Sequence, residues 1–201
     1  MTEMCTAAIL AGGHGRRLGG TDKAALRVGG QRIVDRQVAV LRAITDHVVI
    51  VAAQAGRYSP AGTPVWEDLA PDAGPLGGLH TALVHASTPW ILAVACDLPF
   101  LHVEFLRYLV ASAGDVDLVV PRTRDGYQPL CAMYARRVVD NVAARLAAGR
   151  LDMMGLVHEL RVREIGPDEM AAYDPDGLLL FNVNTPEDYE RAEHLASRRR
   201  T

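Results

Sequence analysis

Lysine is nearly absent from this 201-residue chain, in which Lys23 is the one lysine among 21 lysine and arginine residues. A lysine ammonium is a compact point charge on a flexible stem, whereas an arginine guanidinium is a planar fork. Lys23 closes a glycine-rich loop that begins at Gly12, and glycines let backbone N–H groups approach an anion closely. The lone lysine at this place predicts a phosphate-binding loop, with a surface turn carrying a stray lysine as the alternative.

Features that would point to several other classes of protein are also missing. No run approaches the ~20 apolar residues of a membrane span, and no signal peptide is recognisable. The net charge of -3 provides no overall basic field for nucleic acid. The three cysteines form no CxxC and no zinc-type spacing, which suits a reducing cytoplasm. These absences predict a cytoplasmic protein that binds neither a membrane nor nucleic acid.

Apolar runs and helical periodicities alternate along the chain. Continuous apolar runs predict strands at 6–11, 47–53, 90–95, 117–121, 129–134 and 178–183, and a further strand near 161–165. Helical spacing predicts helices over 34–44, 76–86, 103–113 and 136–148, a short helix near 152–159, and a last helix with Thr185 as N-cap and Pro186 at its first position. This alternation predicts a single α/β domain over 1–201, a Rossmann-like three-layer α/β/α sandwich with a mostly parallel sheet.

The residues with the most suggestive chemistry follow the expected strands. Gly12 follows the first strand, and Asp97 follows the strand over 90–95. Asn182 and Asn184 stand at the end of the strand expected over 178–183. Because ligands of parallel α/β folds bind beyond the carboxyl ends of the strands, these residues are expected to share one site.

The glycine loop differs from two familiar phosphate-binding patterns. A Walker loop has a Gly-Lys pair followed by Ser or Thr, whereas here two residues separate Gly20 from Lys23 and an alanine follows. A dinucleotide fingerprint could begin at Gly13, but Leu18 then occupies the place of its third glycine. The spacing therefore favours neither a P-loop kinase nor a dinucleotide-binding domain.

Asp97 is the candidate magnesium ligand. A carboxylate at the end of a buried strand must stay solvated or hold a cation, and Mg²⁺ prefers carboxylate and phosphate oxygens. The alternative is that Asp97 caps the helix expected over 103–113, but five residues lie between them.

For the other candidate residues, a purely structural role competes more closely with a functional one. Asp68 precedes a Pro/Gly-rich loop and is expected to contact ribose, base or water. Gly77 and Gly78 begin a helix, where small residues allow the backbone to approach a nucleotide or simply make a tight turn. Asn182 and Asn184 would share one face of a strand, where their amide oxygens could ligate Mg²⁺ or orient a phosphate, or could only tie down the strand end.

Three segments together resemble the molybdenum cofactor guanylyltransferase family: LAGGHGRRLGGTDK at 10–23, CDLP at 96–99 and FNVNTPEDYERA at 181–192. The resemblance covers nearly the whole chain and implies a fold of the nucleotide-diphospho-sugar transferase type. It implies a reaction in which GTP and a molybdopterin phosphate give the guanine dinucleotide cofactor and pyrophosphate. A nucleotide-binding half would span about 1–115 and an acceptor-binding half about 116–201.

The resemblance also implies roles for individual residues, carried over by position. GTP is the implied substrate and Mg²⁺ the implied cofactor, with Asp97 and Asn184 as metal ligands and Lys23, Arg17 and Asp97 as the catalytic group. Gln128 and Asn182 would contact or support the acceptor, which is molybdopterin or the molybdenum cofactor. The implied nucleotide-binding residues are Leu10, Ala11, Gly12, Gly13, Lys23, Asp68, Gly77, Gly78 and Asp97.

Two other functions stay open at this point. Ala53 stands where some relatives have an asparagine that helps to bind the nucleotide, so the choice of GTP over CTP is open. One alternative is therefore a cytidylyltransferase of the same cofactor or a sugar-phosphate nucleotidyltransferase. The other is a non-catalytic nucleotide-binding module for cofactor insertion. The resemblance also implies partner proteins that supply the cofactor or mature molybdoenzymes.

Overall fold

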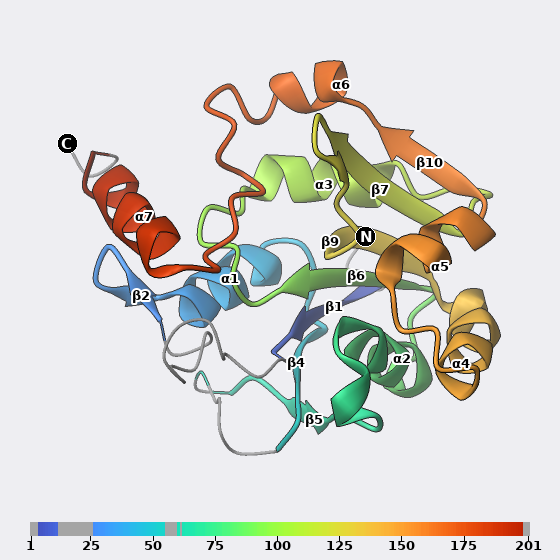
Figure 1. Ribbon diagram of the computed structural model, residues 1–201. Coiled ribbons are helices and arrows are strands. Elements are labelled where there is room, and N and C mark those ends of the chain that lie inside the picture. The colour runs from blue at the N-terminus through green and yellow to red at the C-terminus, as the bar shows by residue number, and fades with distance from the viewer. Residues whose placement is uncertain (1–3, 12–25, 55–59, 61, 199–201) are drawn as a thin grey trace.

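A mostly parallel sheet forms the centre of the fold (Figure 1). The computed structural model describes residues 4–11, 26–54, 60 and 62–198. The sheet contains β1 (Cys5–Leu10), β4 (Val48–Ala52), β5 (Val65–Glu67), β6 (Trp90–Ala95), β7 (Leu118–Thr123), β8 (Gly126–Tyr127), β9 (Cys131–Ala135) and β10 (Val162–Ile165). These strands lie in the order β10-β7-β9-β6-β1-β4-β5, with β8 paired to β7.

The main path of the sheet is interrupted by one antiparallel strand. β1 is parallel to β4 and β6, β4 is parallel to β5, and β10 is parallel to β7. β9 runs antiparallel between β6 and β7. The central strands β1, β4 and β6 are buried along their whole length, which explains why their sequences are continuous apolar runs.

Helices cover both faces of this sheet and create two hydrophobic cores. One face packs against α1 (Ile33–Arg42), α3 (Val103–Ala111) and α6 (Pro167–Ala171). The opposite face packs against α2 (Pro75–His85), α4 (Val139–Ala147) and α5 (Met153–Glu159). The predicted three-layer α/β/α sandwich is confirmed. Among the helices of the described ranges, none is both long enough and apolar enough to cross a membrane.

A third, smaller core lies beside the sheet, where α7 (Pro186–Arg198) meets the antiparallel hairpin of β2 (Arg27–Val28) and β3 (Gln31–Arg32) (Figure 1). The Gly29 N–H donates to the Glu193 carboxylate at 2.8 Å and ties the hairpin to the helix. The core therefore joins the chain that follows the glycine loop to the C-terminal part of the chain. Its buried members are Val28, Ile33, Phe100, Leu178, Val183, Ala192 and Ala196.

The segment 178–183 is not a strand, so the prediction from its apolar run is wrong. The chain there is a turn followed by irregular structure, although Leu178, Leu179 and Val183 are buried. The Asp174 carboxylate, rather than a neighbouring strand, accepts the N–H groups of Leu178 and Leu179 at 2.8 and 3.1 Å. Asn182 therefore does not belong to one face of a strand with Asn184.

The other predicted strands and helices are confirmed, with ends that differ by a few residues. The helix predicted over 136–148 begins as a 3-10 turn at Arg136–Val138 before α4. The elements that sequence reasoning does not predict, β2, β3, β5, β8 and α6, are short and offer no full period of hydrophobicity. The three cysteines are free and buried, as expected for Cys96 and Cys131.

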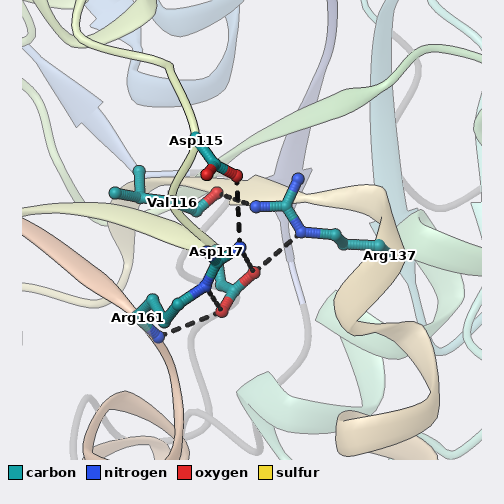
Figure 2. Close-up of polar contacts among 5 residues, drawn as sticks. All are labelled: Asp115, Val116, Asp117, Arg137 and Arg161. Atoms are coloured by element: carbon teal, nitrogen blue, oxygen red, sulfur yellow. Dashed lines mark hydrogen bonds and ion pairs between the residues drawn. The ribbon is translucent and has the colours of Figure 1, made fainter.

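A cluster of ion pairs fixes the amino ends of β7 and β10 (Figure 2). The Asp117 carboxylate accepts from Arg137 Nε at 2.8 Å, and from the main-chain N and Nε of Arg161 at 3.1 and 3.2 Å. Arg137 also donates to the Val116 carbonyl, and Arg161 pairs with Asp115 at 3.4 Å. Burial of Asp117 opposes its ionisation, but these donors outweigh burial and lower its pKa to about 2. Asp117 is therefore ionised at neutral pH and links three segments of the second half.

Candidate active site

The carboxyl ends of the central strands bring the first predicted site residues together. Leu10 pairs with Val51 and with Ala95, so β1, β4 and β6 end side by side. Ala11 continues from β1, and its N–H donates to the Val51 carbonyl at 2.8 Å. The described part of β1 therefore ends at this edge, directly before the glycine-rich segment in the sequence. The predicted residues of that segment, Gly12, Gly13, Arg17 and Lys23, lie outside the described residues, and their roles stay predictions.

Asp97 lies in the turn that follows β6. Its carbonyl accepts the Val183 N–H at 3.0 Å, which holds the segment 182–184 against this turn. Asp97, Asn182 and Asn184 are all half-buried. The structure thus brings these three predicted residues to one place, although the segment that carries the asparagines is irregular.

Gln37 on α1, which sequence reasoning did not single out, holds the same turn from another side. Its side chain is buried, and its Nε2 donates to the Ala95 carbonyl at 2.7 Å and to the Leu98 carbonyl at 3.0 Å. These two carbonyls bracket Asp97. The signal that could have identified Gln37 is an amide on the apolar face of a helix, because buried amides need hydrogen-bond partners.

Asp68 is a buried carboxylate that organises the loop between β5 and α2. Its Oδ1 accepts from the Ala70 N–H at 2.9 Å and from the Thr81 hydroxyl at 3.0 Å. Its own N–H donates to the Ala52 carbonyl at 2.8 Å. Asp68 therefore has a structural role at this edge, and its predicted contact with the nucleotide stays a prediction. Thr81 is a second residue that the sequence analysis missed.

Gly77 and Gly78 form the first turn of α2 and face the same loop. A Cβ on Gly77 would lie 2.2 Å from the carbonyl oxygen of Ala70, so no side chain fits there. A Cβ on Gly78 would lie 3.3 Å from Leu10 Cδ2 and 3.9 Å from Asp68 Oδ2. Gly77 is therefore required by packing, and Gly78 places the backbone of α2 beside Leu10 and Asp68.

Gln128 and Asn182, the two residues predicted on the acceptor side, line one cavity of about 140 Å³. Gln128 Nε2 donates to Thr123 Oγ1 at 3.1 Å, and Asn182 Nδ2 donates to the Leu180 carbonyl at 3.3 Å. Leu98 of the Asp97 turn also lines the cavity, which therefore adjoins the candidate metal ligand. The remaining lining residues are Pro129, Leu130, Cys131, Met153 and Leu180.

Helix α7 begins at this site with the cap expected from the sequence. Thr185 Oγ1 accepts the Asp188 N–H at 3.1 Å, and the Asp188 carboxylate accepts the N–H groups of Asn184 and Thr185 at 3.0 and 2.9 Å. Burial opposes ionisation of Asp188, but these donors prevail and lower its pKa. This reciprocal cap resembles a capping box and fixes the main chain of Asn184 next to the Asp97 turn.

The donors at this edge suit Mg²⁺. Asp97 offers a carboxylate oxygen and Asn184 an amide oxygen, and both are hard oxygen ligands. Among the residues that the structure describes, no group of three or more His, Cys, Asp or Glu side chains could hold a metal ion. Mg²⁺ commonly binds through one or two carboxylates together with substrate phosphates. The donor set therefore fits a cation that protein and nucleotide hold jointly.

Comparison with known sequences identifies the family of this chain. Residues 7–162 match the family model of the MobA-like NTP transferase domain. A molybdenum cofactor guanylyltransferase from Desulfosudis oleivorans is 35% identical over 192 residues, which cover 95% of each chain. A probable molybdenum cofactor guanylyltransferase from Pelotomaculum thermopropionicum is 34% identical over 196 residues, covering 98% of this chain and 95% of that relative.

Solved structures show the same fold. Molybdopterin-guanine dinucleotide biosynthesis protein A from Archaeoglobus fulgidus superposes with a TM-score of 0.82 at 26% identity, covering 97% of this chain and 100% of that one. A 2-C-methyl-D-erythritol 4-phosphate cytidylyltransferase from Thermus thermophilus gives a TM-score of 0.70 at 18% identity, covering 96% and 99%. These structures confirm the predicted nucleotide-diphospho-sugar transferase type of fold.

Proposed function

This chain belongs to the family of MobA-like NTP transferase domains, and on that premise we propose that it transfers GMP from GTP to molybdopterin or the molybdenum cofactor. The products are the guanine dinucleotide form of the cofactor and pyrophosphate. Family membership makes the protein a nucleotidyltransferase. The guanylyltransferase relatives, which match nearly the whole chain, support the guanine nucleotide and the pterin acceptor.

One contact carries the structural side of the proposal, the 3.0 Å hydrogen bond from the Val183 N–H to the Asp97 carbonyl. It brings a carboxylate and two amides from distant parts of the chain to the edge where β1 ends, directly before the glycine-rich segment in the sequence. A nucleotidyl transfer needs phosphate-binding main chain, oxygen ligands for a cation and positive charge in one place, and this contact supports the second of these requirements.

The reaction is an in-line attack of the acceptor phosphate on the α-phosphorus of GTP, with pyrophosphate leaving. The task of the protein is then placement and charge stabilisation rather than proton transfer. Asp97 and Asn184 would hold Mg²⁺, which when bound neutralises phosphate charge and polarises the α-phosphorus. Lys23 and Arg17 would stabilise the charge that develops on the leaving pyrophosphate.

The remaining residues divide between the two substrates. The nucleotide side comprises Leu10 to Gly13, Asp68, Gly77 and Gly78, within a half of about 1–115. The acceptor side comprises Gln128 and Asn182 around their shared cavity, within a half of about 116–201. Both halves contribute strands to one sheet, and we propose that they form one domain. Proteins that supply the pterin or mature molybdoenzymes are the proposed partners.

The first test measures thermal stabilisation by GTP, CTP, ATP and UTP, each with and without Mg²⁺. A nucleotide at ~100 times its dissociation constant adds about 2.7 kcal/mol to the free energy of unfolding. Stabilisation by GTP alone that depends on Mg²⁺ supports the proposal. Preference for CTP would indicate the cytidylyl alternative, in which Ala53 fails to select guanine.

The second test measures pyrophosphate release with GTP and molybdopterin or the molybdenum cofactor. Release that requires both substrates, with formation of the dinucleotide, supports the transferase. A protein that binds GTP yet releases no pyrophosphate with any acceptor would instead be a nucleotide-binding module.

A further inference from the structure

We propose that Gln37 is a positioning residue that holds the Asp97 turn in place for Mg²⁺, an inference that rests on the proposed function of this site. Gln37 lies on the face of α1 that packs into the core, among the buried residues Ile33, Val34, Val38 and Leu41. Only 1% of its surface is exposed. An amide is an unusual choice for such a face, because its polar atoms must find partners there.

The two hydrogen bonds of Gln37 aim at the turn and not at its own helix. Nε2 donates to the Ala95 carbonyl at 2.7 Å, at the end of β6, and to the Leu98 carbonyl at 3.0 Å, just after Asp97. Both partners are carbonyl oxygens, so the nitrogen of the amide must face them. One NH₂ group thus fixes the distance between the two ends of the segment that carries Asp97.

The other atom of the amide indicates that packing alone does not select this residue. Gln37 Oε1 is buried and has no hydrogen-bond partner among the residues that the structure describes. An unsatisfied buried polar atom destabilises a fold by roughly 1–3 kcal/mol. A side chain chosen for stability alone would avoid this loss of stability. We infer that the amide is present because its NH₂ group fixes the turn that carries Asp97.

The turn is held on both sides of Asp97. Gln37 holds the carbonyls of Ala95 and Leu98, while the Val183 N–H holds the Asp97 carbonyl itself. A ligand residue whose main chain is already fixed loses less conformational freedom when it binds a cation. Partners that orient metal ligands typically contribute about 10- to 100-fold in metal affinity or activity.

The test compares Gln37→Met with the unmodified protein. Methionine has a similar length but cannot donate to the two carbonyls. At saturating GTP, the apparent dissociation constant of Mg²⁺, measured by thermal stabilisation, should rise about 10-fold. Binding of GTP without Mg²⁺ should stay nearly unchanged, because the phosphate loop is untouched. If Mg²⁺ binds the variant as it binds the unmodified protein, the proposal is overturned.

Val38→Ala is the matched control, because Val38 is the next residue of α1 and is 3% exposed. It removes core contacts without removing a bond to the turn. It should lower the free energy of unfolding and leave the Mg²⁺ dependence as it was. An equal loss of Mg²⁺ affinity in this control would mean that Gln37 acts only through general stability, which overturns the positioning role.

A measurement without any ligand separates this inference from the proposed function. The Cys96 N–H, in the turn that Gln37 holds, donates to the Leu10 carbonyl at 3.3 Å. Its hydrogen exchange should be faster in Gln37→Met, whereas Val38→Ala should leave this amide as protected, relative to the amides of β6, as it is in the unmodified protein. Should the unmodified protein bind no nucleotide, the proposed function fails and the exchange result still decides whether Gln37 fixes the turn. Gln37→Asn, whose amide is one methylene too short to reach both carbonyls, replaces the methionine variant if that variant does not fold.

Discussion

The edge of the sheet where the strands begin and the edge where they end each carry an important aspartate. The protein fixes these two aspartates in opposite ways. At the amino edge, Asp117 is fixed through its carboxylate, which accepts hydrogen bonds from Arg137 and Arg161 (Figure 2). At the carboxyl edge, Asp97 is fixed through its main chain, by Val183 at its own carbonyl and by Gln37 around it. A carboxylate held by guanidinium groups serves the fold, whereas one positioned by its backbone can serve a ligand.

The largest expected effect comes from removing the candidate metal ligand at the carboxyl edge, a change that should leave the protein folded. Asp97→Ala should lower the rate of pyrophosphate release by about 10²–10³, the range for losing one charge-stabilising group in an active site. The free energy of unfolding should change little, because Gln37 and the Val183 N–H hold this turn by its main-chain carbonyls, which the substitution keeps. Steady-state turnover and a denaturation curve check both halves of the prediction. Near-normal turnover would remove Asp97 from the site.

Gly77→Ala sharpens the comparison by straining the loop that carries Asp68. Its Cβ would meet the Ala70 carbonyl oxygen at 2.2 Å, so backbone must shift, and the free energy of unfolding should fall by about 1–3 kcal/mol. Gly78→Ala is the control, since the closest atom to its Cβ is the flexible end of Leu10 at 3.3 Å, and it should cost less. Urea denaturation of both variants measures the difference, and equal costs would contradict this account of the loop.

Asp117→Asn tests the amino edge and should leave turnover unchanged. The folded-state pKa is lowered to about 2 from the ordinary value of 3.8, so the ionised carboxylate contributes stability at neutral pH. That contribution, roughly 2 kcal/mol from the pKa shift, is complete above about pH 5 and is lost as the pH falls toward about 2. The gap in stability between variant and unmodified protein should therefore close over this pH range. If the difference in stability persists at the acid end of the range, the Asp117 side chain stabilises the fold through its hydrogen-bond geometry and not through its charge.

Thr185→Ala should give the smallest effect, a loss of about 1 kcal/mol of stability from removing the cap of α7. Thr185→Ser keeps the hydroxyl that accepts the Asp188 N–H and should restore most of it. Because the cap also fixes the main chain of Asn184, the alanine variant should bind Mg²⁺ with GTP somewhat more weakly. Calorimetric melting of the two variants provides the measurement. Equal melting temperatures would show that the hydroxyl contributes nothing to the helix.

The sequence predicts the parts of this molecule that depend on long periodic patterns. The buried strands Cys5–Leu10 and Trp90–Ala95 are continuous apolar runs, and the order of strands and helices predicts a parallel sheet with ligands at its carboxyl edge. The position of Asp97 at that edge follows from the same pattern. Its role as a metal ligand remains a prediction.

The wrong and the missing predictions concern features that depend on contacts between distant residues. The apolar run at 178–183 is typical of a strand, yet Leu178 and Val183 pack in the third core while Leu179 packs in the core beside α1 and α3. The Asp174 carboxylate, not a neighbouring strand, accepts the N–H groups of Leu178 and Leu179. Gln37 and Thr81 were missed because a polar residue on the apolar face of a helix indicates only that it needs a hydrogen-bond partner, whereas its role depends on which distant residue that partner is. Local propensity carries no information about such partners.

The hydrogen bond between Gly29 and Glu193 spans 164 residues, and this separation has a consequence for biosynthesis. On a ribosome that adds roughly 5–20 residues per second, the hairpin after the glycine loop emerges on the order of ten seconds before the helix it packs against. Until then the nascent chain contains Asp97 without the segment of Asn184 that packs against its turn. A nucleotide that met such a fragment would lack the proposed C-terminal side of the site, so productive binding is expected only after that segment has emerged.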